Sequence, residues 1–145
     1  EILAESLPAS NLARISKDVV KPPPADLFGP EPEMPWCRSY QEASLSRQYN
    51  DWQNVTQTAL KVLQDGYSPS DIRSNSPHEW APFIQGLAYG GYWEAAEKIT
   101  LEASEKHQKY KPWLCALWAR LDEKTLESPE KRLAMNNIKH TMVCK

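Results

Sequence analysis

Residues 80–103 read WAPFIQGLAYGGYWEAAEKITLEA, and this stretch decides the fold class. Apolar residues recur at i, i+3, i+4, i+7 and i+8, the pattern of an amphipathic helix; they are Trp80, Phe83, Ile84, Leu87 and Ala88. Gly90-Gly91 ends that helix, and Trp93 opens a second one. A helix, a tight glycine turn and another helix predict an antiparallel helical hairpin.

A similar pattern occurs earlier in the chain. Laying Trp52 on Trp93, an offset of 41 residues, aligns residues 50–52 with residues 91–93. In each copy an aromatic residue opens the second helix directly after a tight turn, and small residues follow where the helices would cross. Small residues at a crossing let two helices approach closely. We therefore predict stacked hairpins, each closed at its open end by an aromatic side chain.

Helical periodicity extends to the C-terminal region. Further helices are expected at about 36–49, at 52–65, from 111 onward and at 129–141. Asp51 and Ser128 stand where helix N-caps are favoured, and Gly66 stands where a left-handed residue ends a helix. No segment alternates apolar and polar residues over a strand length. The prediction is an all-α domain of about five to six helices over residues 36–145.

Residues 1–35 have a different composition. They contain seven of the twelve prolines and a net charge of −3 from six acidic and three basic residues. Proline runs at 22–24 and 30–32 favour an extended backbone, and a short helix is expected at 10–20. We interpret this segment as an extended Pro-rich arm, with Leu27, Phe28 and Trp36 as candidates for packing it onto the helices.

Charge and hydropathy exclude some classes of partner. The formal net charge of −2 leaves no excess of basic residues to neutralise a phosphate backbone, so nucleic-acid binding is not expected. No run of about 18 apolar residues occurs, so direct membrane insertion is not expected either. The sequence begins at Glu1 without Met, which we interpret as a fragment or a processed product.

The three cysteines leave their pairing open. Cys37 and Cys115 each neighbour a tryptophan or an apolar run, which favours buried thiols; a Cys37–Cys115 disulfide is the alternative and would require an oxidising compartment. Cys144, near the C-terminus, is expected to be exposed. The three histidines cluster with none of them, so neither a metal nor another cofactor is expected.

Catalytic patterns are absent from the sequence. Asp51, Asp65, Asp71 and Glu79 are the plausible carboxylates, and each stands where a cap or turn residue is expected. There is no Gly-rich phosphate loop and no nucleophile elbow. We predict no catalytic residues and no enzymatic activity for this chain.

At the turn and after it, the second hairpin resembles the tetratricopeptide repeat (TPR). Gly91, Trp93, Ala96 and Ala103 match that motif's Gly, aromatic, Ala and Ala positions, and residues 50–62 form a weaker copy. The offset of 41 differs from the usual repeat of about 34 residues. The resemblance implies stacked TPR-like hairpins and no particular ligand.

In TPR-like stacks the first helix of each hairpin lines the concave face. The resemblance therefore implies a partner-binding surface on those helices, formed by Arg38, Tyr40, Gln41, Arg47, Trp80, Gln85 and Tyr89. Arginine and aromatic residues are the types that anchor interfaces. The alternative for Tyr40 and Trp80 is that both belong to the core.

A second resemblance covers most of residues 20–121. It rests on the order of residues 27–32 (LFGPEP), 36–43 (WCRSYQEA), 47–48 (RQ), 51–52 (DW), 82–84 (PFI) and 114–118 (LCALW). This order resembles the C-terminal soluble domain of polytopic membrane proteins of Chloroflexus-type bacteria. Their membrane part resembles dolichyl-phosphate-mannose-type glycosyltransferases. The resemblance implies an extracytoplasmic helical domain that holds none of that family's catalytic carboxylates.

The sequence thus favours a non-catalytic protein-interaction or scaffold domain appended to such a membrane protein. Its partner would be a protein or peptide, including the membrane-embedded part of its own parent chain. One alternative is a free-standing, cytoplasmic TPR-like adaptor that binds peptides near Tyr40, Arg47 and Tyr89. Another is a carbohydrate-binding module, because exposed tryptophans can stack on sugars.

Overall fold

The computed structural model describes residues 24–29, 35–70 and 76–144. The chain divides into two units, Glu1–Glu33 and Met34–Lys145. Within the first, the described residues form the one-turn helix α2 (Ala25–Phe28), and Leu27 is exposed. This turn was not predicted from the sequence. The helix expected at 10–20 and nearly all of the proline runs at 22–24 and 30–32 lie outside the described residues.

The second unit is built from helices. These are α3 (Pro35–Gln48), α4 (Trp52–Gln64), α5 (Ala81–Tyr89), α6 (Trp93–Lys106), α7 (Lys111–Lys124) and α8 (Pro129–Met142), with the 3-10 turns η3 (Pro77–Trp80) and η4 (Gln108–Tyr110). No strand occurs among the described residues, which confirms the all-α prediction. The helix expected to begin at Trp80 begins one residue later, because residues 77–80 form the 3-10 turn.

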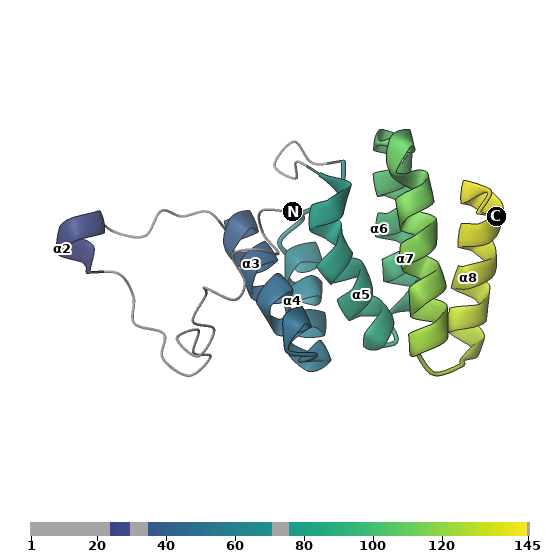
Figure 1. Cartoon of the computed structure of the whole chain (residues 1–145), viewed down its shortest axis with the longest axis horizontal. Coiled ribbons are helices and arrows are strands. Elements are labelled where there is room, and N and C mark those ends of the chain that lie inside the picture. The colour runs from purple at the N-terminus through teal and green to yellow at the C-terminus, as the bar shows by residue number, and fades with distance from the viewer. Residues whose placement is uncertain (1–23, 30–34, 71–75, 145) are drawn as a thin grey trace, which may run out of the picture. The chain divides into compact units, whose positions relative to one another are not determined.

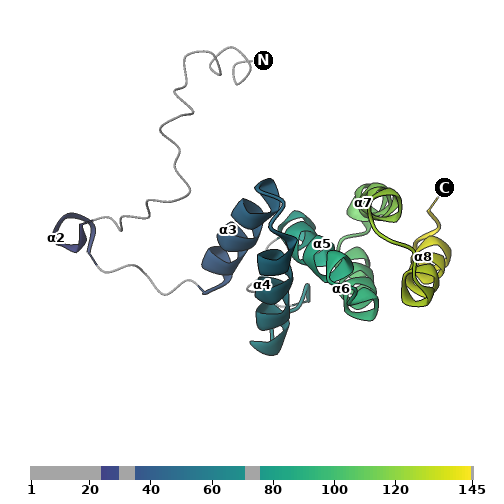
Figure 2. The same ribbon diagram turned by 90° about the horizontal axis from the view of Figure 1, so that it is seen from below.

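Helices α3 to α8 follow one another along the unit in chain order (Figure 1). Seen from below, α3, α5 and α7 lie in one row and α4, α6 and α8 in the other (Figure 2). Helix α5 packs against both α3 and α4, whereas α8 packs against α6 and α7. Helices α5 and α8 thus each pack on two earlier helices, and such packing stabilises helices of 9 and 14 residues that would be marginal in isolation.

The helix ends follow local chemistry that the sequence shows. The carboxylate of Asp51 accepts a hydrogen bond from the backbone amide of Asn54 at the start of α4. The hydroxyl of Ser128 accepts one from the amide of Lys131 at the start of α8. Gly66, after α4, has φ +78°, the left-handed conformation that glycine adopts without strain. The predicted caps at these three positions are confirmed.

The second hairpin turn repeats backbone hydrogen bonds of the first. The amide of Asp51 donates to the carbonyl of Ser46 at 2.9 Å, and the amide of Tyr92 donates to the carbonyl of Leu87 at 2.8 Å. The residue preceding each amide, Asn50 or Gly91, is left-handed, with φ of 57° and 81°. Every donor and acceptor in the second turn lies 41 residues after its counterpart in the first, so the offset read from the sequence holds in the backbone.

Aromatic side chains fill the first part of the core. Trp36 packs against the rings of Tyr67, Trp80 and Phe83 at centroid distances of 4.8 to 5.3 Å. Its indole nitrogen donates to the carboxylate of Glu79 at 2.6 Å, so this carboxylate anchors a core side chain. Trp36 is therefore a residue of the helical core, and Glu79 has a structural role.

A glycine sets the closest helix crossing. A Cβ atom at Gly86 in α5 would lie 2.7 Å from Cγ1 of Val55 in α4, and 2.9 Å from the backbone of that residue. Such distances are below van der Waals contact, so only glycine allows α5 to lie this close to α4. Small residues were predicted where helices cross, but Gly86 was not identified as one of them.

Candidate partner-binding surfaces

The residues predicted to form one binding surface lie on different faces of α3. Nine residues separate Arg38 from Arg47, and at about 100° per residue the two side chains point to opposite sides of the helix. Arg38 is exposed and forms an ion pair with Glu42 at 3.5 Å. Gln41 is also exposed and lies about 100° from Tyr40 and about 120° from Arg47 around the helix axis. Arg38 and Gln41 therefore do not belong to a surface with Arg47.

The two aromatic candidates, Trp80 and Tyr40, differ in how far they are buried. Trp80 is only 1% exposed and belongs to the core, so the surface role expected for it is wrong. Tyr40 is half-buried and packs against the core from α3. Burial of Trp80 follows from its position at the end of η3, where its ring lies 4.8 Å from that of Trp36.

Three of the predicted residues do lie together: Arg47, Gln85 and Tyr89. Trp52 lies beside them. We call these four residues the Arg47 cluster. Nη1 of Arg47 donates to Oε1 of Gln85 at 3.1 Å, which links α3 to α5. Tyr89 lies one turn further along α5 and stacks on Trp52 of α4, with ring centroids 3.8 Å apart and an interplanar angle of 12°. All four side chains are half-buried, so each keeps part of its surface in solvent.

The chemistry of this cluster is that of an interface anchor. Among the described residues Arg47 has no carboxylate partner, and its hydrogen bond to Gln85 leaves other N–H donors of the guanidinium for a ligand. A guanidinium beside an aromatic stack can bind a carboxylate with two hydrogen bonds and can pack against a planar group. Sequence reasoning assigned Trp52 only to closing the hairpin. The signal that could have placed it here is its position directly after the turn that ends α3.

A second surface lies between α7 and α8, and we call it the α7–α8 groove. Its volume is about 570 Å³. The lining residues are mostly apolar: Lys111, Pro112, Cys115, Ala116, Trp118, Ala119, Met135, Ile138, Lys139, Met142, Val143 and Cys144. The volume falls within the range of about 300–1,000 Å³ that is typical of ligand pockets. No residue of this groove was predicted from the sequence as part of a site.

Two cross-links join the helices on either side of this groove. Cys115, one turn into α7, forms a disulfide with Cys144, just beyond the end of α8. Further along the two helices, the ammonium of Lys139 in α8 lies 3.7 Å from a carboxylate oxygen of Asp122 in α7. The groove is therefore held between two helices whose separation is set by a covalent bond and an ion pair.

The disulfide corrects both interpretations of the cysteines. Cys37 is a free, exposed thiol on α3, not a core thiol and not the partner of Cys115. Cys144 is half-buried rather than exposed. The antiparallel packing of α7 and α8 brings the start of one helix to the end of the other, and only this arrangement makes Cys115 and Cys144 neighbours.

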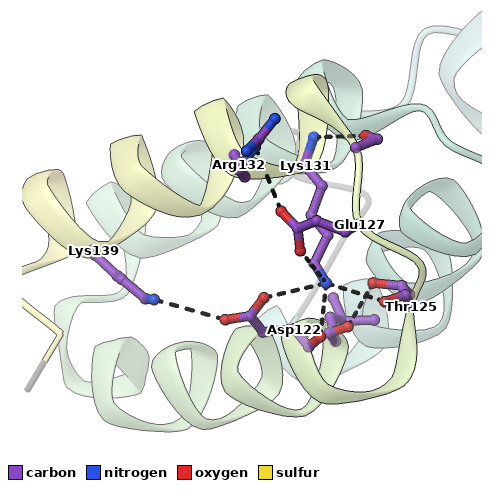
Figure 3. Close-up of polar contacts among 8 residues, drawn as sticks. Asp122, Thr125, Glu127, Lys131, Arg132 and Lys139 are labelled. Atoms are coloured by element: carbon purple, nitrogen blue, oxygen red, sulfur yellow. Dashed lines mark hydrogen bonds and ion pairs between the residues drawn. The ribbon is translucent and has the colours of Figure 1, made fainter.

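The described residues also hold a buried charged network at the other end of these two helices (Figure 3). Lys131 is only 2% exposed, and its ammonium donates to the carbonyl oxygens of Asp122 at 2.7 Å and Thr125 at 3.1 Å. The carboxylates of Asp122 and Glu127 lie 3.2 and 3.4 Å from the same nitrogen. These carbonyls belong to the end of α7, where a cation offsets the helix dipole. The network is a structural cap.

A shallower hollow of about 450 Å³ lies beside the turn between α5 and α6. It is lined by Gly91, Tyr92, Trp93, Glu94, Ala95, Lys98 and Glu130. Hydrogen bonds from its own backbone amide and from Ser128 hold the pKa of Glu130 below its usual value. The hollow thus presents the carboxylates of Glu94 and Glu130 together with Lys98 and the exposed Tyr92.

The described residues contain neither a metal-binding group nor a membrane-spanning helix. Over the described ranges 24–29, 35–70 and 76–144, no three His, Cys, Asp or Glu side chains are placed to hold a metal ion. None of the helices in these ranges has the length and apolar character needed to cross a bilayer.

No family model matches this sequence, and comparisons with curated proteins and with solved structures found no similar chain.

Proposed function

We propose that this chain is a non-catalytic, TPR-like interaction domain that binds a segment of a partner protein through the Arg47 cluster. The observation that carries the proposal is a half-buried guanidinium beside a solvent-accessible aromatic stack. Arginine, tyrosine and tryptophan dominate the energetics of protein interfaces. The preferred partner segment carries a carboxylate for Arg47 and a flat or apolar group for Tyr89.

The TPR-like part of the proposal is supported by the repeated hairpins. The turn after α5 repeats backbone hydrogen bonds of the turn after α3, and Trp52 and Trp93 are each the first residue of the following helix. The two rows of helices in Figure 2 are the arrangement that stacked hairpins produce. The Arg47 cluster lies where the first hairpin meets the second.

The wider proposal is that the domain belongs to the extracytoplasmic part of a membrane glycosyltransferase-like protein. The Cys115–Cys144 disulfide supports an extracytoplasmic location, because disulfides persist in oxidising compartments. The motif order between residues 27 and 118 supports the parent protein. A free cytoplasmic adaptor has less support, since a reducing compartment would open this bond. Carbohydrate binding also has less support, because four of the six tryptophans are buried: Trp36, Trp80, Trp93 and Trp118.

The experiment for the binding surface is a peptide array probed with three proteins. These are the wild type, the double variant Arg47→Glu with Tyr89→Ala, and the control Arg38→Glu, which changes an exposed arginine on the opposite side of α3. Peptides that bind the wild type should bind the double variant at least about tenfold more weakly, as expected for loss of two anchors. The control should bind as the wild type does. Binding that survives the double change in a folded variant contradicts the assignment.

The location is tested separately. An antibody against the domain is applied to membrane and soluble fractions of source cells. A large membrane-bound band supports the parent protein that we propose, and a soluble band near 16.6 kDa contradicts it.

A further inference from the structure

We propose that the α7–α8 groove binds one amphipathic helix of a partner protein, and that an acidic residue of that helix pairs with Lys111. This inference is independent of the Arg47 cluster, which lies on α3, α4 and α5. It rests on the shape of the groove, on how other helices of this fold are seated and on the charge of the lining.

The shape of the groove suits the ridge of a helix. Exposed Pro112, Ala116 and Ala119 follow one another along α7 at spacings i, i+4 and i+7, so their small side chains form one low edge. On the α8 side, Met135, Ile138 and Met142 are buried and form an apolar floor. Side chains of a helix laid along small residues can reach such a floor.

The packing of α5 shows which kind of element covers the face between two paired helices. Helix α5 packs against both members of the preceding pair, α3 and α4, and covers the face between them. Helices α7 and α8 form the last described pair, and no described helix covers the groove between them. A further helix is therefore the element that continues this packing. We assign this helix to a partner protein whose charge complements the lysines of the lining.

The lining carries positive charge only. It contains two lysines and no carboxylate. Lys139 already pairs with Asp122, but Lys111 has no ion-pair partner among the described residues and is only half-buried. Lys111 is the first residue of α7, at the disulfide end of the groove. An acidic residue near one end of the bound helix would meet this free ammonium.

These features specify the ligand. The distance from Lys111 to Ala119 along α7 is eight residues, or about 12 Å, so the groove holds a little more than two turns of a helix. The bound helix needs apolar residues at i, i+3, i+4 and i+7 and a Glu or Asp about one turn from one end of that stripe.

The test is a selection from a displayed library of 18-residue helices that are randomised on one face. The bait is the oxidised wild-type protein. Selected helices should carry the apolar stripe and an acidic residue near one end. Affinity for the synthetic peptides should fall at least tenfold in Ala119→Arg, which fills the groove from an exposed position. It should stay within twofold in Arg120→Ala, an exposed neighbour outside the lining.

A charge exchange tests the role of Lys111. Selection on Lys111→Glu should return helices with Lys or Arg in place of the acidic residue. Enrichment of helices without a preferred charge, from both baits, would overturn the assignment of Lys111. Circular dichroism of each variant checks that the helices remain folded.

Other occupants give different results. Binding of decanoate or of anionic vesicles that Ala119→Arg abolishes, without any selected helix, would mean a lipid site and would overturn the proposal. A wild-type dimer in sedimentation that Ala119→Arg dissociates would mean a second copy in the groove, and would overturn it as well. A selection that returns no helix sensitive to Ala119→Arg has the same consequence.

Discussion

Replacing Lys131 by Met tests whether the buried ammonium holds the end of α7 to the start of α8. Met keeps most of the side-chain length but removes the charge and its hydrogen bonds. Two of these bonds go to backbone carbonyls, at 2.7 and 3.1 Å, and hydrogen bonds to a charged group contribute about 1.5–3 kcal/mol each.

The net effect is smaller than the sum of these bonds. Burying an ammonium costs several kcal/mol of hydration, and Met avoids that cost. Loss of one partner from a buried pair typically destabilises by about 3–5 kcal/mol because the other charge is left unpaired. Here Asp122 and Glu127 are 40% and 58% exposed, so water can solvate both carboxylates in the variant. We therefore expect the free energy of unfolding to fall by about 2–3 kcal/mol, somewhat below that range.

The assay is urea denaturation followed by tryptophan fluorescence, with m-values compared to confirm a common transition. Arg132→Met is the matched control. Arg132 pairs with the same Glu127 at 3.6 Å, but it is 67% exposed, and exposed ion pairs contribute about 0.2–1 kcal/mol. Equal stability losses in the two variants would refute the reasoning, because burial would then make no difference to how much the contact contributes to the free energy of unfolding.

Three further predictions concern stability. Trp93→Ala should destabilise by about 3–5 kcal/mol, because this ring is buried against Trp118; a loss below about 1 kcal/mol in calorimetry would contradict its role in closing the hairpin. Replacing Cys115 and Cys144 by Ser should cost about 3.5 kcal/mol, from the chain entropy of a loop with a sequence separation of 29, and a reductant should then no longer change the melting temperature. Val143→Gly should stabilise by about 1 kcal/mol in urea titrations, because this β-branched residue has φ 57°, and no gain would mean that the lost side-chain contacts outweigh the relieved strain.

The sequence allowed most of the helices to be predicted, because their signals are local. Asp51, Gly66 and Ser128 act through hydrogen bonds and backbone angles within one turn, and each was found at its expected helix end. The offset of 41 residues was visible for the same reason, since each turn has a left-handed residue two positions before its tryptophan. Local chemistry of this kind depends little on what packs against it.

The candidate surfaces depended on packing that the sequence does not show. Arg47, Gln85 and Tyr89 were named correctly as residues of α3 and α5, but Trp52 joined them only because α4 crosses α5 at Gly86. Trp80 does not belong to the surface, because the rings of Trp36 and Phe83 pack against it. TPR-like binding therefore stays a proposal that rests on three of the seven residues first named.

Tertiary structure alone decided how distant segments meet. The pairing of Cys115 with Cys144, the burial of Lys131 and the α7–α8 groove all require α7 and α8 to lie antiparallel at a set separation. Helical periodicity shows which face of a helix is apolar, but it does not show which other helix covers that face. The sequence by itself therefore determined where helices begin, end and repeat, since these depend on hydrogen bonds between near neighbours. The surfaces left open for a partner were decided by side-chain packing between helices.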